Sequence, residues 1–212
     1  MSGLNQQDEN FFQAKGYQTK ILPLTEIKLY TPTDFLFNQL KQSEWVFFTS
    51  QAAVKNILPL SNNEIKIAVI GKKTAQVVYD CGRIPTFVSS TETKRAMLKE
   101  WQECYPEPTT IFYPKSQLAD DYIETELSAN YKITSFIAYQ NCCPPTAKKD
   151  LRTLLSSENI QAVYLTSPSS WKRFLSVYQE FKTKLVIFTI GETTKQAVLR
   201  DGYEAKIIGN IE

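Results

Sequence analysis

Residues 44–55 read EWVFFTSQAAVK and residues 161–172 read QAVYLTSPSSWK, so one pattern of a strand followed by a helix occurs twice in the chain. A second match follows, because GKKTAQVVYDCG at 71–82 and GETTKQAVLRDG at 191–202 repeat Gly, Thr, Gln, Val and Gly without a gap. Repetition over this distance indicates a duplicated structural unit. The identities in the first match are Val46 and Val163, Thr49 and Thr166, Ser50 and Ser167, and Lys55 and Lys172.

Short apolar runs alternate with helical patterns along both halves. The runs WVFFTS, IAVIG, TIFYPKS, ITSFIAY, AVYLTS, LVIFTIG and AKIIG are almost continuously apolar, which is typical of strands covered on both faces. Segments such as TDFLFNQLKQ and SSWKRFLSVYQEF lie between them and place apolar residues three and four positions apart. This alternation predicts an α/β fold in which each half has a parallel sheet flanked by helices.

The two halves differ at their outer ends. The stretch SGLNQQDENFFQAKGY from Ser2 resembles SQLADDYIETELSANY from Ser116, but only the second is preceded by a strand, TIFYPK. The second half also stops at AKIIGNIE, directly after a predicted strand. We therefore expect the first strand and the last helix of the repeated pattern to be missing. The repeat alone places a domain boundary near residues 106–108.

Composition excludes several classes of protein. The chain has no histidine, so it has no Ser-His or Cys-His nucleophile pair and no imidazole metal ligand. A formal charge of +2 is too balanced for a protein that binds a nucleic-acid backbone. The four cysteines form no C-x-x-C pair, and the seven glycines form no nucleotide-binding loop. We expect no metal and no nucleic acid as a partner.

Targeting and membrane signals are also missing from the pattern of residues. The first residues, MSGLNQQDEN, carry no basic segment followed by an apolar one, and no apolar stretch approaches the 18 residues of a membrane span. The sequence therefore predicts a cytoplasmic protein without a membrane partner.

Two kinds of junction between a strand and a helix carry the candidate site. Thr-Ser ends a strand at Ser50 and at Ser167, and Gly-x-x-Thr follows a strand at residues 71–74 and 191–194. A serine there can cap the helix, and the same free N–H groups can also bind a carboxylate or a phosphate, so both interpretations stay open. Carboxyl ends of parallel strands are where open α/β sheets place their ligands. Two such rims facing each other would form a cleft in which oriented amides attract a polyanion.

Lysines and one tyrosine lie near these junctions. Lys72, Lys73 and Lys115 could add positive charge, although a solvated surface lysine is the simpler interpretation of each. Tyr139 closes a strand before Pro144 and Pro145, and local sequence alone favours an ordinary amphipathic tyrosine.

The segments FFTSQAAV, IAVIGKKTAQVV, IAYQ, YLTSPSSWKRF and TIGETTKQAVLRDG, in this order, resemble uroporphyrinogen-III synthase from about Gly16 to Gly202. Sequences of this family usually open with a strand ending in Thr-Arg, which this chain lacks. The resemblance implies two α/β domains joined by a two-stranded extended linker, and it decides the boundaries in place of the repeat. The implied discontinuous domain is 1–25 plus 142–212, the inserted domain is 29–137, and the linkers are 26–28 and 138–141.

The resemblance also implies an activity. Members of the family are hydro-lyases of porphyrin and haem biosynthesis, which cyclise hydroxymethylbilane, a linear tetrapyrrole with eight carboxylates, to uroporphyrinogen III. Ring D is inverted and water is lost, without a cofactor. Loss of the hydroxyl from ring A gives an azafulvene, which ring D attacks to form a spiro intermediate that fragments and recloses.

Site residues are carried over from the family by position. Tyr139 matches the linker tyrosine, whose phenol could donate a hydrogen bond to the departing hydroxyl. Arginine is common in the family near the helix after TIFYPK, where this chain has Lys115 and Asp120. The residues that we expect to bind the substrate are Ser50, Gly71, Thr74, Lys115, Ser167, Gly191, Thr193 and Thr194.

A monomer fits the modest charge and the flexible linkers. We expect the partner to be the small-molecule substrate, with a transient handover from hydroxymethylbilane synthase. An alternative is a non-enzymatic two-domain clamp that closes on an anionic metabolite. Binding of a polycarboxylate without turnover would favour this alternative.

Overall fold

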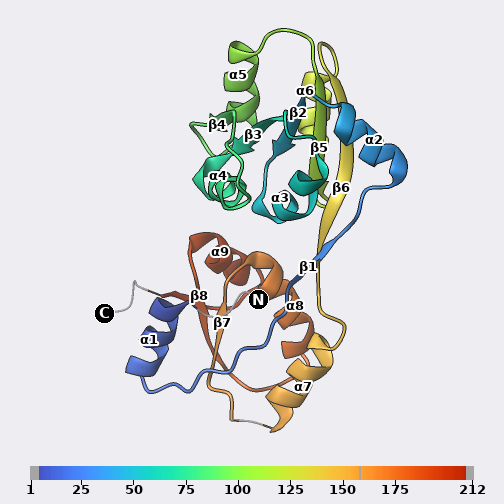
Figure 1. Cartoon of the computed structure of the whole chain (residues 1–212). Coiled ribbons are helices and arrows are strands. Elements are labelled where there is room, and N and C mark those ends of the chain that lie inside the picture. The colour runs from blue at the N-terminus through green and yellow to red at the C-terminus, as the bar shows by residue number, and fades with distance from the viewer. Residues whose placement is uncertain (1–4, 158, 209–212) are drawn as a thin grey trace. The chain divides into compact units, whose positions relative to one another are not determined.

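The computed structural model describes residues 5–157 and 159–208 of the 212-residue chain. The chain divides into two compact units, which are coloured along the sequence in Figure 1. Unit 1 combines the segment that ends at Glu26 with the segment that begins at Cys142, and unit 2 is Ile27–Asn141. Both units consist of strands and helices in alternation, and the predicted α/β class is confirmed.

Unit 2 contains a six-stranded sheet in the order β1-β6-β5-β2-β3-β4. The pairs β2·β3, β2·β5, β3·β4 and β5·β6 are parallel, as the near-continuous apolar runs predict. The strands are β1 (Glu26–Leu29), β2 (Trp45–Phe48), β3 (Lys66–Ile70), β4 (Phe87–Ser89), β5 (Thr110–Ser116) and β6 (Lys132–Cys142).

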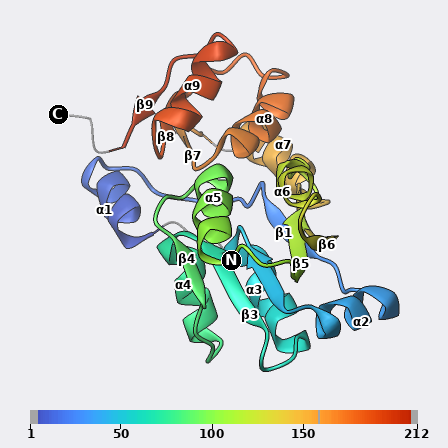
Figure 2. The same ribbon diagram turned by 90° about the horizontal axis from the view of Figure 1, so that it is seen from above.

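Helices cover both faces of the unit 2 sheet (Figures 1 and 2). In β2, Val46 and Phe48 pack with α2, α3 and α4, while Trp45 and Phe47 pack with α5 and α6 on the other face. Full burial of a side chain such as Phe47 contributes about 1.5–3 kcal/mol, so the centre of the sheet holds the unit together. The helices are α2 (Asp34–Gln42), α3 (Gln51–Ile57), η1 (Leu58–Leu60), α4 (Gly71–Asp80), α5 (Lys94–Cys104) and α6 (Tyr122–Leu127).

The pairing of β5 with β6 contains one irregularity. Lys115 lies opposite Ile137, but the next residue, Ser116, lies opposite Tyr139, so β6 has an extra residue at Ala138. This is a β-bulge, a feature that changes the direction of the side chains that follow it. Ala138 and Tyr139 both pack against the α3 and α4 side of the sheet as a result.

Unit 1 has a three-stranded parallel sheet in the order β7-β8-β9. Three helices cover one face, where Trp171 and Phe174 pack with Leu165 and Ile187 (Figure 2). The elements after the boundary are α7 (Ala147–Ser157), β7 (Ala162–Leu165), α8 (Pro168–Tyr178), β8 (Val186–Thr189), α9 (Glu192–Arg200) and β9 (Lys206–Ile207).

Helix α1 (Gln6–Ala14) lies on the other face of this sheet. The ring of Phe12 is 5.4 Å from those of Tyr164 and Phe188, and the Tyr164 hydroxyl donates a 2.7 Å hydrogen bond to Asp8 Oδ2. Aromatic contacts and one hydrogen bond therefore attach α1 to β7 and β8.

The expected lack of a first strand and a last helix also concerns residues 1–4 and 209–212, which lie outside the described residues, so it stays a prediction. Among the helices within residues 5–157 and 159–208, none is long and apolar enough to cross a membrane.

Candidate functional site

The predicted site residues of unit 2 gather at one edge of its sheet. Strands β3, β2, β5 and β6 are parallel neighbours, so their carboxyl ends lie together. We call this edge the unit 2 rim, which consists of Ser50, Gly71, Thr74, Lys115 and Tyr139. In unit 1, β7 and β8 are likewise parallel, and the unit 1 rim consists of Ser167, Gly191, Thr193 and Thr194.

The Thr-Ser serines cap the helices that follow them. Ser50 Oγ accepts a hydrogen bond of 3.3 Å from the N–H of Ala52 in α3. Ser167 forms a capping box with Ser170, because each side chain accepts a 3.1 Å hydrogen bond from the backbone N–H of the other. In the free protein both hydroxyls thus serve the helix N-termini, which are the groups that an incoming carboxylate would also engage.

The two Gly-x-x-Thr glycines differ in conformation. Gly71 has φ +74° and is buried, and a Cβ added there would lie 2.6 Å from Oε1 of Glu92. Only glycine avoids strain in this left-handed region. Gly191 is extended at the N-cap of α9, and a Cβ there would meet no described heavy atom within 4 Å. The carboxylate of Glu92 therefore lies against the start of α4, whereas the space beside Gly191 at the start of α9 is open.

The threonines of these motifs differ in exposure. Thr74 and Thr194 are 5% and 3% exposed, on the buried sides of α4 and α9. Thr193 is exposed, so it is the threonine of this set that a ligand can reach without a rearrangement.

Lys115 is the penultimate residue of β5, and its buried side chain forms ion pairs with two carboxylates. Its Nζ is 2.7 Å from Asp121 Oδ1 and also binds Glu124 in the first turn of α6. Burial alone would lower the pKa of Lys115, but the hydrogen bonds to Asp121 and Glu124 raise it above its ordinary value. Lys115 is therefore a charged ammonium that two carboxylates of the chain already hold.

Tyr113 and Thr49 lie beside the unit 2 rim, although the sequence did not identify them as site residues. Their hydroxyl oxygens are 3.4 Å apart, and the Tyr113 ring is fully buried among the residues that pack with α5 and α6. Burial raises the pKa of the Tyr113 phenol, and the negative charge of Glu124 raises it further. The alternation of TIFYPKS puts Tyr113 and Lys115 on one face, which is the signal that could have linked them.

Tyr139 is half-buried beside the core of α3 and α4. The bulge at Ala138 places it opposite Ser116, and its carbonyl accepts a 3.0 Å hydrogen bond from the N–H of Gln117. The backbone of Tyr139 is thus held beside the end of β5, near the carboxyl end of the sheet.

Other polar features of the structure do not belong to the set of predicted residues. Thr189 Oγ1, at the end of β8, is buried without a hydrogen-bond partner among the described residues. Within residues 5–157 and 159–208, no three His, Cys, Asp or Glu side chains are grouped as metal ligands. A hollow of about 610 Å³ between α5 and α6 includes none of the predicted site residues, and its lining is Arg95, Leu98, Lys99, Gln102, Glu103, Tyr122 and Glu126.

The fold and the two rims define an α/β protein with parallel strands, of the class that places ligands at the carboxyl ends of those strands. The model of the family "Uroporphyrinogen-III synthase HemD" matches residues 7–209. The chain belongs to the uroporphyrinogen-III synthase family, an enzyme family of lyases that acts on a small tetrapyrrole.

Solved structures of this family have the same fold. A mutant uroporphyrinogen III synthase from the extremely thermophilic bacterium Thermus thermophilus is 12% identical, with a TM-score of 0.58 over 95% of this chain and 87% of that chain. Uroporphyrinogen-III synthetase from Helicobacter pylori is 18% identical, with a TM-score of 0.58 over 90% of this chain and 89% of that chain. No curated protein matches the chain by sequence.

Proposed function

We propose that this chain cyclises hydroxymethylbilane to uroporphyrinogen III, with inversion of ring D and loss of water. The observation that carries the proposal is the family match over residues 7–209. The grouping of the predicted residues at the carboxyl ends of parallel strands in each unit supports it.

Each rim takes a share of the substrate carboxylates. The helix N-termini at Ser50, Ser167 and Gly191 supply backbone N–H groups, and Thr193 adds an exposed hydroxyl. Hydrogen bonds to a charged group contribute about 1.5–3 kcal/mol each, so a few of them suffice for an octacarboxylate. A formal charge of +2 is consistent with binding mainly through amides and hydroxyls.

Tyr139 assists departure of the ring A hydroxyl by donating a hydrogen bond from its phenol. The C–O bond of that hydroxyl breaks as the pyrrole nitrogen electrons form the azafulvene, the pyrrole N–H gives up its proton, and hydroxide and this proton leave together as water. The azafulvene is reactive without further activation, so the main work of the protein is to hold ring D where its substituted carbon attacks. A mechanism that relies on one hydrogen-bond donor and on positioning of ring D needs no histidine and no cofactor.

The proposal includes the localisation, the oligomeric state and the source of the substrate. We propose a cytoplasmic monomer that receives hydroxymethylbilane by a transient handover from hydroxymethylbilane synthase. The modest formal charge supports the monomer, the residue pattern of the chain supports the cytoplasm, and the tetrapyrrole substrate of the family supports the handover.

A coupled assay tests the function. Porphobilinogen and hydroxymethylbilane synthase generate the substrate, and the products are separated by isomer. We expect isomer III in the presence of the chain and isomer I in the control without it. Isomer I alone, at the spontaneous rate, would contradict the proposal, and binding of a polycarboxylate under the same conditions would then favour the clamp.

A further inference from the structure

The cluster around Lys115 holds more negative than positive charge. One ammonium contacts two carboxylates, Asp121 and Glu124, so the cluster carries a net charge of −1 when all three groups are ionised. Lys115 nevertheless lies on the rim that receives substrate carboxylates in the proposed function. An incoming carboxylate would meet repulsion from a like charge unless one of the two internal carboxylates leaves.

The two internal carboxylates are bound unequally. The side chain of Glu124 is 18% exposed and that of Asp121 is 82% exposed, whereas the Lys115 side chain is 11% exposed. An ion pair with so exposed a partner is weak, because water and salt compete for it. Asp121 can therefore leave at low cost, while Glu124 is held in place.

Two further observations identify Asp121 as the exchangeable carboxylate. It occupies the N-cap position of α6, yet among the described residues its side chain makes no capping hydrogen bond, so its departure does not cost the helix a cap. The neighbouring Asp120 is engaged elsewhere, with Oδ1 2.6 Å from Lys94 Nζ. Hydrogen bonds from Lys94 and from the backbone N–H of Tyr122 lower the pKa of Asp120, so it stays ionised with its own partners.

We infer that Asp121 is an internal carboxylate that occupies the anion position of Lys115 in the free protein, and that a substrate carboxylate displaces it while Glu124 remains. The inference rests on the proposed function, and it adds a residue that sets substrate affinity. Lys115 keeps its charge during the exchange because Glu124 still accepts from Nζ. Asp121 thus acts through Lys115 and does not touch the reacting atoms.

The test is the variant Asp121→Asn in the isomer-resolved assay. Removing the competing charge should lower KM about two- to fivefold, the range expected for an exposed ion pair, with kcat unchanged. The matched control is Glu126→Gln, which removes one negative charge from an exposed residue of the same helix that is not an ion-pair partner of Lys115 among the described residues. In a Lys115→Gln background, Asp121→Asn should no longer lower KM.

The outcomes are distinct. An unchanged or higher KM for Asp121→Asn, or an equal fall for Glu126→Gln, would overturn the exchange. A direct measurement separates this result from failure of the proposed function: fluorescence titration with uroporphyrin III, an octacarboxylate. If the wild type forms only isomer I, the proposed function fails. Tighter uroporphyrin III binding by Asp121→Asn than by Glu126→Gln would still support the exchange, and equal binding would overturn it.

Discussion

Gly71 and Gly191 occupy equivalent positions in the repeat, but only the backbone conformation at Gly71 disfavours residues other than glycine. Gly71→Ala should lower the free energy of unfolding of unit 2 by about 1–3 kcal/mol, because alanine is strained at φ +74° and its Cβ would press on Glu92. Urea denaturation followed by circular dichroism measures the change.

Gly191→Ala is the matched control for this substitution. Its backbone is extended and the space around it is open, so the only expected cost is the weaker N-cap preference of alanine, below about 1 kcal/mol. Equal losses in the two variants would show that the positive φ of Gly71 does not matter.

Tyr139 is the residue to which the proposed function assigns chemistry. Tyr139→Phe keeps the ring against the core of α3 and α4 but removes the hydrogen-bond donor. We expect the rate of isomer III formation to fall by up to about 10²-fold, the lower end of the range for a general acid, with the circular dichroism spectrum unchanged.

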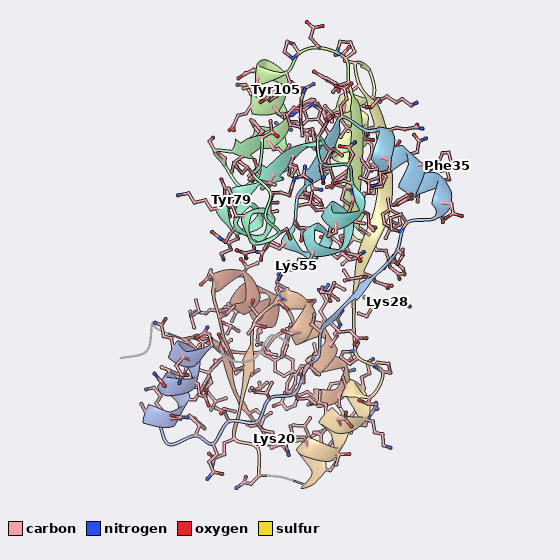
Figure 3. The ribbon with its side chains drawn as sticks, in the orientation of Figure 1. Lys20, Lys28, Phe35, Lys55, Tyr79 and Tyr105 are labelled. Carbon is pink, nitrogen blue, oxygen red and sulfur yellow. The ribbon has the colours of Figure 1, made fainter. Side chains whose placement is uncertain are left out.

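The control for Tyr139→Phe is Tyr79→Phe, since Tyr79 is an exposed tyrosine on α4 (Figure 3). This variant should react at the wild-type rate. Wild-type kinetics in Tyr139→Phe as well would remove the catalytic role of the phenol.

At the scale of single elements, the start of α8 combines a structural and a proposed binding role. Ser167→Ala removes one half of the capping box with Ser170, so the free energy of unfolding of unit 1 should fall by about 1 kcal/mol. The change should be smaller for Ser50→Ala, because Ser50 makes a single 3.3 Å capping bond to the shorter helix α3. Chemical denaturation of both variants tests the order, and a larger loss in Ser50→Ala would contradict it.

The elements themselves were largely predictable from sequence. Almost continuous apolar runs and the repeat at Thr49-Ser50 and Thr166-Ser167 predict parallel strands followed by capped helices, because these signals are local. The bulge at Ala138 was not predictable in this way, since it depends on how β6 pairs with β5. The direction of Tyr139 therefore follows from the sheet and not from the pattern of IAYQ.

For the site residues, too, the position along the chain was predictable from local signals, but the contacts that depend on tertiary structure were not. The sequence favoured Lys115 as a solvated surface lysine that could add charge to the rim, whereas the structure buries it near the end of β5. Its partners Asp121 and Glu124 lie only six and nine residues away, yet the turn into α6 that brings them back to Nζ leaves no signal in the sequence. Gly71 and Gly191 are identical in the repeat, and their different φ values depend on the packing of each unit.

At the scale of the whole molecule, one phenol in each unit favours the protonated state: that of the buried Tyr113 and that of the half-buried Tyr164. Burial raises the pKa of Tyr113 in unit 2, and burial together with Asp8 raises that of Tyr164 in unit 1. The unfolded chain ionises its tyrosines near pH 10, so above that pH it binds fewer protons than the folded chain. The raised pKa of Lys115 acts in the same direction. Stability from these groups is therefore complete below about pH 10 and is lost as the pH rises further.

This linkage predicts a late step in the alkaline titration of the 11 tyrosines. In the native protein, the ultraviolet absorbance of phenolate should rise in two stages, because the fold opposes ionisation of Tyr113 and Tyr164, and the circular dichroism signal should weaken during the second stage. Tyr164→Phe should remove one phenol from the second stage, and Tyr113→Phe should remove another. In strong denaturant, all phenols should titrate in one stage near pH 10. A native titration that matches the denatured one would contradict the prediction, since no phenol would then link folding to alkaline pH.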